Sequence, residues 1–468
     1  MIPKLWFQLG MLSGEACLQL ACSAVMYVLI SRIEGPELLG QYSLVLAWVL
    51  LFQALATFGI PEFLLREIGK SRDRGEAYAG QGLAVGSVTT VVAVLIMGGA
   101  VSILYGEEMR WALLLGTLFL PSAVMGAICR ACFIAQGRTR VVFLLALAET
   151  LCTLPVNVAL ILHHGRIIPL IATLVAGKFV VSLLALSLFT TGEVRSGFSL
   201  RSAFSKELLS PLFSFAMSGI LGLISIRLNL ILLSLFGTLA AVGQFAAASK
   251  LLGVLLIIPS VVAQMALPRY AAHFSGGGTG GEARDRTLLS LLFASVFPLA
   301  VGVTIFAPLL MSLLFTGEFL PAVPIVRILM LYAVIETADA MMGVTLKAAG
   351  HQRDDLRLYS FNPFVNVLLG LASIPAFGGL GAAGAKLAGA LCSSLSRYRF
   401  IIRRRLPLPL SADFWLPIAA SALAGLCLVG LGWDAYFITT ILYAMMAGLF
   451  LHLGYRLIGS RAPWLLSP

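Results

Sequence analysis

The sequence predicts an all-α polytopic membrane protein with about 14 transmembrane helices: two parallel six-helix repeats around a central cavity, followed by two C-terminal helices. Hydrophobic residues make up 59% of the 468 residues and charged residues only 11%, and the mean hydropathy is +0.98. Apolar runs of about 20 residues, the length that a bilayer-spanning helix needs, recur along the chain. The polar gaps between these runs are too short to hold a soluble domain.

Each apolar run predicts one span. The expected spans cover residues 11–31, 38–60, 77–105, 111–135, 140–163, 167–190, 208–236, 241–267, 287–315, 321–346, 356–376, 380–402, 411–432 and 436–457. The first run contains Glu15 and lacks a convincing small-residue cleavage site. We therefore expect a retained first helix rather than a cleaved signal peptide.

The formal net charge of +11 reflects membrane topology. Most of the 32 Lys and Arg residues lie in one set of alternate connections, with Arg130 and Arg397 among them, whereas the other set holds only Arg32, Arg110 and Arg166. Connections rich in Lys and Arg stay in the cytoplasm. We therefore expect a multi-pass membrane protein with both termini cytoplasmic, surrounded by membrane lipid and without a nucleic-acid partner.

The second half of the chain repeats motifs of the first half. Gly40-Gln41-Tyr42 is echoed by Gly243-Gln244-Phe245, and Val156-Asn157 is echoed by Val365-Asn366. The offset of about 203–213 residues corresponds to six spans. An even number of spans preserves orientation, so the repeats are parallel and form two lobes around a cavity. This pattern predicts an N-lobe over residues 1–200, a C-lobe over 201–405, and two C-terminal helices over 406–468.

Two cations interrupt the first pair of apolar runs in the predicted C-lobe. Arg227 lies in the first run and Lys250 in the second, and a tight Gly237-Thr238 turn joins the runs. At about 1.5 Å per residue, both cations lie roughly 12–14 Å below the same outer face. A cation at mid-bilayer costs at least about 2.5–3.5 kcal/mol, so it faces a cavity or a partner. The pair predicts a bound anion, with ion pairs to Glu149 or Glu336 as the alternative.

Further charged residues lie inside the predicted spans. Lys178, Arg327 and Lys386 join Arg227 and Lys250 as candidate substrate-binding residues of the cavity. Arg327 and Lys386 lie near the outer ends of their spans, so snorkelling to the headgroups is the alternative for both. Glu149, Glu336 and Asp339 are candidates either for ion coupling or for counter-charges of the cations. Glu15 and Glu62 lie near the cytoplasmic ends, where we expect them to be solvated.

No sequence pattern predicts a catalytic residue, a metal site or a cofactor. The Cys129-Arg130-Ala131-Cys132 motif stands alone at a membrane helix end, and we expect all seven cysteines to be small buried side chains rather than disulfides. Gly69-Lys70-Ser71 resembles the end of a phosphate-binding loop, but Leu64 occupies the required upstream glycine position. The small-residue run 378–389 predicts close helix packing rather than nucleotide binding.

Several motifs follow one another in order along nearly the whole chain. They are Gly35-Pro36-Glu37-Leu38-Leu39-Gly40-Gln41-Tyr42-Ser43, Leu65-Arg66-Glu67-Ile68, Phe319-Leu320-Pro321-Ala322, and Ile374-Pro375-Ala376-Phe377-Gly378-Gly379-Leu380-Gly381. In this order they resemble Wzx-type polysaccharide (O-antigen) flippases of the multidrug/oligosaccharidyl-lipid/polysaccharide (MOP) exporter superfamily. Asn229 stands where relatives often carry an aspartate.

The resemblance implies a flippase that moves an undecaprenyl-pyrophosphate-linked oligosaccharide from the cytoplasmic to the outer leaflet by alternating access, for cell-surface polysaccharide biosynthesis. Polysaccharide polymerase or ligase proteins of the same pathway are possible further partners. A lipid II flippase and a drug/cation antiporter of the same superfamily are the alternatives, and a membrane polysaccharide polymerase or ligase is the alternative from another class. Such an enzyme needs a catalytic loop at the membrane surface, which the short outer loops disfavour.

Overall fold

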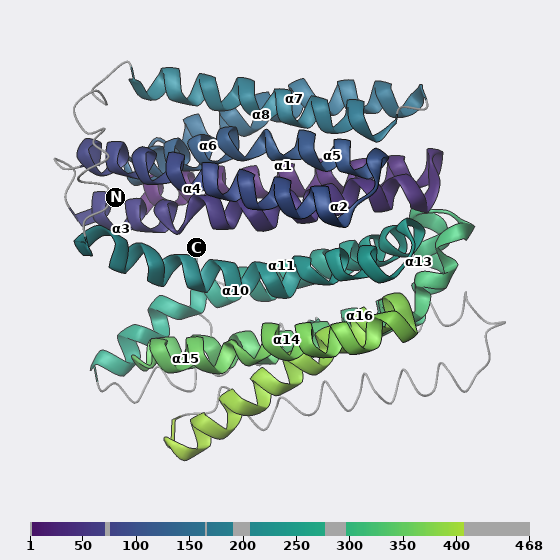
Figure 1. The fold of residues 1–468 in the computed structure, drawn as a ribbon. Helices are drawn as coiled ribbons and strands as arrows, with labels where there is room; N and C mark the ends of the chain where they lie inside the picture. Colours follow the sequence, from purple (N-terminus) through teal and green to yellow (C-terminus); the bar gives the residue numbers. More distant parts are fainter. Residues whose placement is uncertain (1, 71–74, 164–165, 191–205, 277–295, 407–468) are drawn as a thin grey trace. The chain divides into compact units, whose positions relative to one another are not determined.

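The computed structural model describes residues 2–70, 75–163, 166–190, 206–276 and 296–406, and the regular elements within these ranges are all helical (Figure 1). The described ranges contain ten helices long and apolar enough to span a membrane, or eleven if Val296–Ile305 and Ala307–Leu314, bent by 75°, form one span. The predicted all-α, multi-span fold is thus confirmed. The predicted spans 411–432 and 436–457 lie outside the described residues, so the total of 14 stays a prediction.

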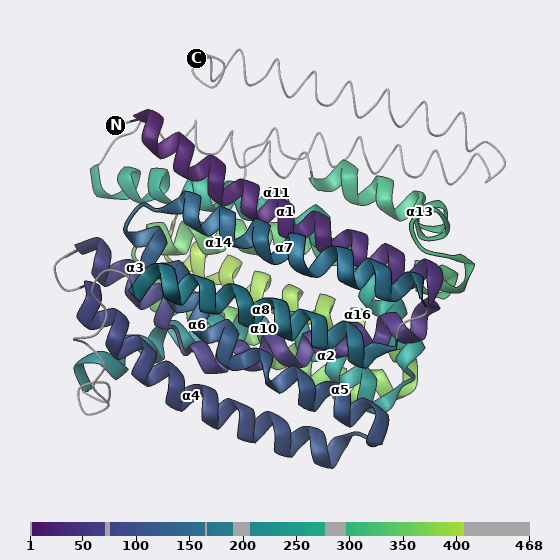
Figure 2. The same cartoon turned by 90° about the horizontal axis from the view of Figure 1, so that it is seen from above.

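The helices form two compact units, of which the first ends at Ala246 and the second begins at Ala247. The first unit holds α1 (Ile2–Ile33), α2 (Gly35–Thr57), α3 (Ile60–Lys70), α4 (Gly75–Leu104), α5 (Glu107–Thr117), α6 (Phe119–Ala135), α7 (Thr139–Leu162), α8 (Ile167–Thr190), α10 (Lys206–Phe236) and the start of α11 (Leu239–Gly276). Within it, α1 packs on α7, α2 packs on α4 and α10, and α6 packs on α8. These helices lie side by side along their length (Figures 1 and 2).

The second unit begins at Ala247 and continues through the rest of α11. It then holds the helix Val296–Ile305, α13 (Ala307–Leu314), the 3₁₀ helix η3 (Gly317–Ala322), α14 (Val323–Ala348), α15 (Gln352–Tyr359) and α16 (Phe361–Arg403). Here α14 and α15 both pack on α16. The predicted lobe boundary after residue 200 is not tested by this division and stays a prediction.

Large apolar side chains are exposed along helices of the first unit. On α4, Ile103 is 85% exposed, Leu95 is 68% exposed and Val91 is 59% exposed. Soluble monomers rarely expose a continuous apolar surface of this kind. Lipid tails are as apolar as leucine, and a helix satisfies its own backbone polar groups, so this surface suits contact with a bilayer.

The connection after α2 contains a short helix, α3, that is not among the predicted spans. Phe58 and Gly59, with φ of 45° and 72°, end α2 in left-handed geometry and turn the chain into α3. On α3, Ile60, Leu64 and Ile68 are buried, and they recur at the four-residue spacing of one helix face. The segment escaped detection because an 11-residue amphipathic helix is too short and too polar to resemble a span.

α16 contains two of the predicted spans. Its 43 residues measure about 64 Å at about 1.5 Å per residue, which is twice the hydrocarbon thickness of about 30 Å. Gly378, with φ 53° and ψ −128°, breaks the helix. The Ser373 hydroxyl donates to the Gly381 carbonyl at 3.1 Å, and a Cβ on Gly389 would lie 2.6 Å from the Asn362 carbonyl oxygen. The two halves therefore fold back on each other as a hairpin, and the small-residue run packs closely as predicted.

The glycines of the repeated Gly-Gln-aromatic motif contact each other. A Cβ on Gly40 in α2 would overlap the carbonyl oxygen of Leu239, and a Cβ on Gly243 in α11 would overlap the carbonyl oxygen of Pro36. Each of these carbonyls stands four residues before the opposite glycine, so the contact is reciprocal. The backbones approach so closely that neither position has room for a side chain.

This contact predicts that Gly40→Ala and Gly243→Ala destabilise the protein. Overpacking against backbone typically costs about 1–3 kcal/mol, so both variants should melt at a lower temperature than the wild type when detergent-solubilised protein is heated. Gly99→Ala on α4 is the matched control, because a Cβ there meets nothing within 4 Å. It should stabilise the helix by about 0.5–1 kcal/mol. Equal melting temperatures for the three variants would contradict the close contact.

Candidate functional site

A groove of about 270 Å³ runs between α2, α3 and α10 in the first unit, and we call it the α2/α10 groove. The residues that α10 contributes recur at nearly one helical turn: Phe215, Gly219, Leu223 and Arg227. From α2 come Leu50, Gln53, Ala54 and Thr57, also at helical spacing. Gly59 contacts Ala216 of α10, and Arg227 lies about 16 Å further along that helix. Two facing helices therefore place a cation deep in the groove.

The Arg227 guanidinium carries an unused donor. Its Nε is buried and has no hydrogen-bond partner in the part of the chain that the structure describes. The Tyr27 hydroxyl of α1, which accepts a hydrogen bond from Ser43 Oγ at 3.2 Å, is within electrostatic reach. The carboxylate that lines the groove is Glu62, which is exposed. A buried unpaired donor costs about 1–3 kcal/mol, and a side-chain movement that opens this donor to the groove would let a bound anion remove that cost.

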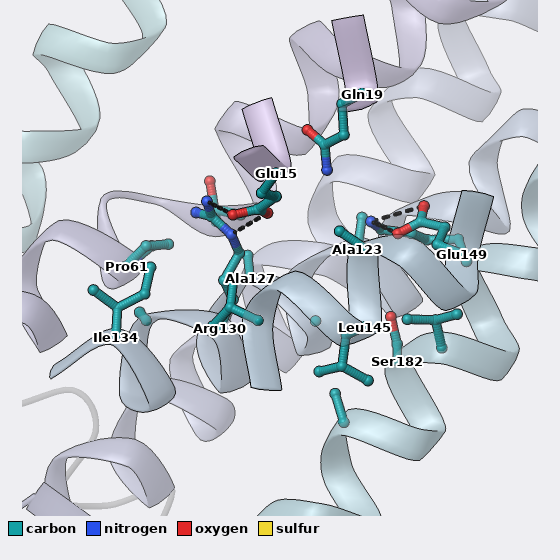
Figure 3. Close-up of a pocket in the computed structure, with 18 of the residues that line it drawn as sticks. Glu15, Gln19, Pro61, Ala123, Ala127, Arg130, Ile134, Leu145, Glu149 and Ser182 are labelled. Carbon is teal, nitrogen blue, oxygen red and sulfur yellow. Dashed lines mark hydrogen bonds and ion pairs between the residues drawn. The ribbon is translucent and has the colours of Figure 1, made fainter. Parts of the chain in front are cut away.

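A larger cavity of about 410 Å³ lies among α1, α2, α3, α6, α7 and α8, and we call it the six-helix pocket (Figure 3). Two ion pairs line it. Lys178 Nζ donates to both carboxylate oxygens of Glu149, at 3.1 and 3.0 Å. Arg130 donates from Nε and Nη2 to the two oxygens of Glu15, at 2.9 and 2.8 Å. Glu149 is thus the counter-charge of Lys178 in this structure, and the ion pair considered between Glu149 and Arg227 does not form.

Two expectations about this pocket were wrong. Glu15 is only 3% exposed and bound to Arg130, so it is not solvated. Arg130 is part of α6 rather than of a cytoplasmic connection. Both residues lie near the ends of their apolar runs, where distance along the sequence suggests solvent. The helices continue past that point and pack against each other, so α6 presents its cation to the carboxylate of α1.

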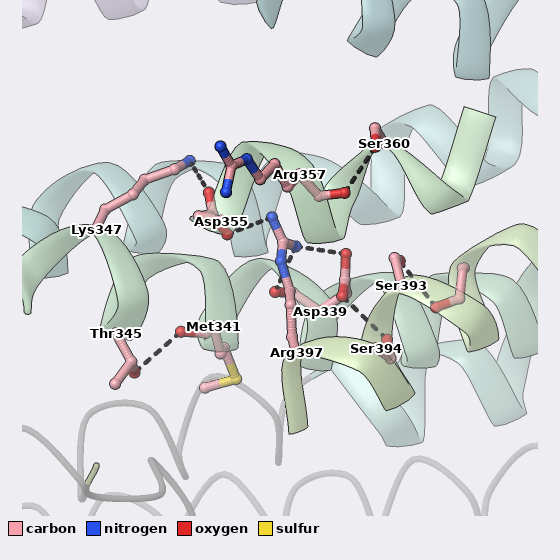
Figure 4. A network of polar contacts seen from close by, with 11 residues as sticks. Asp339, Met341, Thr345, Lys347, Asp355, Arg357, Ser360, Ser393, Ser394 and Arg397 are labelled. Atoms are coloured by element: carbon pink, nitrogen blue, oxygen red, sulfur yellow. Dashed lines mark hydrogen bonds and ion pairs between the residues drawn. The ribbon is translucent and has the colours of Figure 1, made fainter. Parts of the chain in front are cut away.

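In the second unit, Arg397 binds two carboxylates (Figure 4). Its Nη1 lies 2.6 Å from the Asp339 carboxylate and donates to the Asp339 carbonyl at 3.1 Å, and its Nη2 lies 2.6 Å from the Asp355 carboxylate. Arg397, Asp339 and Asp355 are all at most 4% exposed. Lys347 Nζ approaches Asp355 at 3.6 Å. The cluster ties α14, α15 and α16 together.

The sequence analysis missed Arg397 because it counted this residue among the cytoplasmic connections. Asp339, a candidate for ion coupling or counter-charge, is the counter-charge of Arg397 in this structure. Gly343 on α14 makes room for the guanidinium, since a Cβ there would lie 3.2 Å from Arg397 Nη2. The partners are 58 positions apart in the chain, so no local spacing could have revealed the pair.

Lys386 and Glu336 lie near Tyr332 in the same unit. Lys386 is 5% exposed and its Nζ is 4.9 Å from the centroid of the Tyr332 ring, so it does not snorkel to the headgroups. Glu336 stands one turn after Tyr332 on α14, within electrostatic reach of Lys386. Glu336 Oε2 is buried and, among the described residues, has no hydrogen-bond partner. Of the three predicted acids, Glu336 keeps an unused acceptor inside the protein.

The two remaining predicted cations differ in exposure. Arg327 is exposed in the second turn of α14, as expected if it snorkels. Lys250 is half-buried in α11. Lys250 belongs to the second unit and Arg227 to the first, so their common depth stays a prediction.

Cys129 and Cys132 are buried free cysteines, but Cys17, Cys152 and Cys392 are exposed, so the expectation that every cysteine is buried was wrong. Within the described ranges no cluster of His, Cys, Asp and Glu could hold a metal.

Many apolar helices of spanning length, with two charge-lined cavities in the first unit, define a multi-pass membrane protein. The family of polysaccharide biosynthesis proteins matches residues 16–273, more than half of the chain, and the chain belongs to this family. No curated protein matches the sequence. The predicted resemblance to a polysaccharide biosynthesis family is thereby confirmed.

Solved structures share the fold. The lipid II flippase MurJ in an inward closed conformation matches with a TM-score of 0.76 and 12% identity, over 95% of this chain and 98% of that chain. An inward-facing multidrug resistance MATE family transporter of the MOP superfamily matches with a TM-score of 0.68 and 16% identity, over 83% and 94%. A MOP superfamily transporter from Pyrococcus furiosus matches at 0.60 and 14%, over 86% and 95%. The chain therefore shares its fold with these transporters.

The charge cluster of the second unit predicts that Arg397→Met is strongly destabilising. Removing one partner of a buried ion pair leaves uncompensated charge and costs about 3–5 kcal/mol, here at Asp339 and Asp355. Arg399→Met is the matched control, because Arg399 is exposed two residues further along α16. Thermal unfolding in detergent should show a large loss for the first variant and little change for the second. Equal losses would contradict the cluster as a source of stability.

Proposed function

We propose that this protein is a flippase that moves an undecaprenyl-pyrophosphate-linked oligosaccharide from the cytoplasmic to the outer leaflet of a bacterial inner membrane, with both termini cytoplasmic. Membership of the polysaccharide biosynthesis family and the MOP transporter fold support a lipid-linked substrate. The observation that carries the proposal is Arg227, with its buried unused donor in the α2/α10 groove.

The chemistry of Arg227 suits a diphosphate. A guanidinium presents a planar fork of donors that matches phosphate oxygens, and such charge-assisted bonds are about twice as strong as neutral ones. A diphosphate crossing hydrocarbon without partners would lose its hydration, which is the main cost of translocation. Arg227 in the groove replaces part of that hydration, while the lipid tail stays in the membrane and the sugars occupy polar cavity space.

Alternating access completes the proposed mechanism. The substrate enters from the cytoplasmic side, the diphosphate binds at Arg227, and the cavity then opens to the other side. Lys250, Lys178, Arg327 and Lys386 are secondary candidates: Lys178 is already paired with Glu149, and Arg327 is exposed. Glu336, with its unused acceptor, is the candidate for ion coupling. Polymerase or ligase proteins of the same pathway are the proposed partners.

The lipid-linked sugar pool tests this function. Cells with and without the protein are compared, and a probe added from the periplasmic side reports the leaflet in which the sugars lie. Accumulation of undecaprenyl-pyrophosphate oligosaccharide in the cytoplasmic leaflet without the protein supports the flippase, and mass spectrometry then identifies the sugar. Accumulation of lipid II instead would identify a lipid II flippase. An unchanged pool with greater sensitivity to cationic drugs would identify an antiporter.

Variants of Arg227 test separately how much its positive charge and its planar guanidinium geometry contribute to transport. Arg227→Ala removes one or more charge-assisted hydrogen bonds, each about 1.5–3 kcal/mol, so surface polysaccharide should fall at least about tenfold. Arg227→Lys keeps the charge but loses the fork, so its output should lie between those of Arg227→Ala and the wild type. Arg166→Ala, an exposed arginine at the predicted outer surface, is the control. Output is measured per amount of membrane-inserted protein, and normal output from Arg227→Ala would refute the diphosphate site.

A further inference from the structure

The six-helix pocket and the α2/α10 groove are neighbours inside the first unit. Gln53 and Thr57 of α2 line both cavities. Arg227 lies on the groove side of this shared wall, and the two ion pairs lie on the pocket side. A ligand whose anionic part binds at Arg227 therefore has a second polar cavity beside it.

The six-helix pocket balances its own charge. Arg130 is bound to Glu15 and Lys178 is bound to Glu149, so two positive and two negative side chains face the same space (Figure 3). A diphosphate in this pocket would meet two carboxylates whose cations are already occupied. A lipid tail would strip water from charged groups without replacing any hydrogen bond. The pocket suits neither of these parts of the proposed substrate.

An uncharged sugar suits the pocket. Sugar hydroxyls donate to carboxylates and accept from amides, ammonium and guanidinium groups. Gln53 is half-buried and Gln19 is exposed, and neither amide has a hydrogen bond among the described residues. Arg130 uses Nε and Nη2 on Glu15, which leaves further guanidinium donors for a ligand. The volume of about 410 Å³ falls within the range of about 300–1,000 Å³ typical of small-molecule sites.

We propose that the six-helix pocket binds the uncharged sugar next to the diphosphate, so that it recognises the first sugar while Arg227 holds the diphosphate. This inference rests on the proposed function for the position of the diphosphate. It names the substrate class more closely: a lipid diphosphate whose first sugar is neutral. Selection against an acidic first sugar follows because both cations that line the pocket are already paired with carboxylates, so the pocket offers the sugar's carboxylate no unpaired counter-charge.

The test compares two lipid probes: farnesyl diphosphate, and farnesyl diphosphate carrying one N-acetylglucosamine. Dissociation constants for both are measured on the purified full-length protein in detergent. Ala127→Phe fills the six-helix pocket, because Ala127 lines it. Gln53→Leu removes the amide of the shared wall. Gln81→Leu is the matched control for that change, because Gln81 lies on α4 and lines neither cavity.

The readout is the ratio of the two dissociation constants. The wild type and Gln81→Leu should bind the sugar-bearing probe about tenfold more tightly, which corresponds to about 1.4 kcal/mol. In Ala127→Phe and Gln53→Leu the ratio should fall to about one, because the sugar no longer fits or loses its amide partner. Arg227→Ala should weaken both probes by the same factor.

Three results would overturn the sugar pocket. They are equal affinity of the wild type for both probes, a sugar preference that survives in Ala127→Phe, and tighter binding of a probe that carries glucuronic acid in place of N-acetylglucosamine. In each of these cases, if probe binding is still weakened by Arg227→Ala, the proposed diphosphate site at Arg227 remains supported. Failure of the wild type to bind either probe, or binding unaffected by Arg227→Ala, defeats the proposed function itself.

Discussion

A charged side chain inside a membrane protein is removed from bulk water, so it needs a counter-charge or a hydrogen-bond partner within the protein or a cavity. The structure depends on how each buried charge obtains such a partner. Arg130 lies against Glu15, Lys178 against Glu149, and Arg397 between Asp339 and Asp355. Each pair joins two different helices, some of them consecutive in the chain and others distant, and would be costly to separate. Arg227 differs from these residues in two ways: none of the described carboxylates forms an ion pair with it, and it lines a cavity while its Nε has no hydrogen-bond partner among the described residues. In the proposed function, structural and functional charges therefore differ in whether the protein itself supplies the counter-charge.

The spans could be predicted because a run of apolar residues is a local property. The break in α16 could also be predicted from the sequence, because a glycine-rich stretch interrupts an apolar segment that is twice as long as one span needs. Ion-pair partners were not readable: Arg130 and Glu15 are 115 positions apart, and only packing brings them together. The exposure of charged residues was also predicted wrongly where it was inferred from their distance to the nearest end of a predicted span. Glu15 lies near the start of its predicted span and Arg397 near the end of its predicted span, yet neighbouring helices cover both side chains almost completely.

The first unit contains two neighbouring cavities whose linings suit different chemical groups. A cation with an unused donor lines one cavity, a charge-balanced set of polar side chains lines the other, and α2 provides the wall between them. In the proposed function this arrangement matches the order of groups in the substrate, where an anionic linkage is followed by a polar, uncharged sugar. Both recognition elements belong to one compact unit. That unit could therefore keep hold of the headgroup without depending on contacts from the second unit.

The contact between the Gly40 and Gly243 segments is two-fold symmetric, although both segments belong to a single chain. Each glycine meets the carbonyl four residues before its counterpart, so exchanging the two segments reproduces the same contact. This is the geometry of an isologous dimer interface, in which one surface patch is complementary to itself. The two segments therefore meet as the two copies of one motif would meet across a two-fold axis. A substitution at either glycine disturbs both halves of the contact, because each glycine lies against the segment that holds the other.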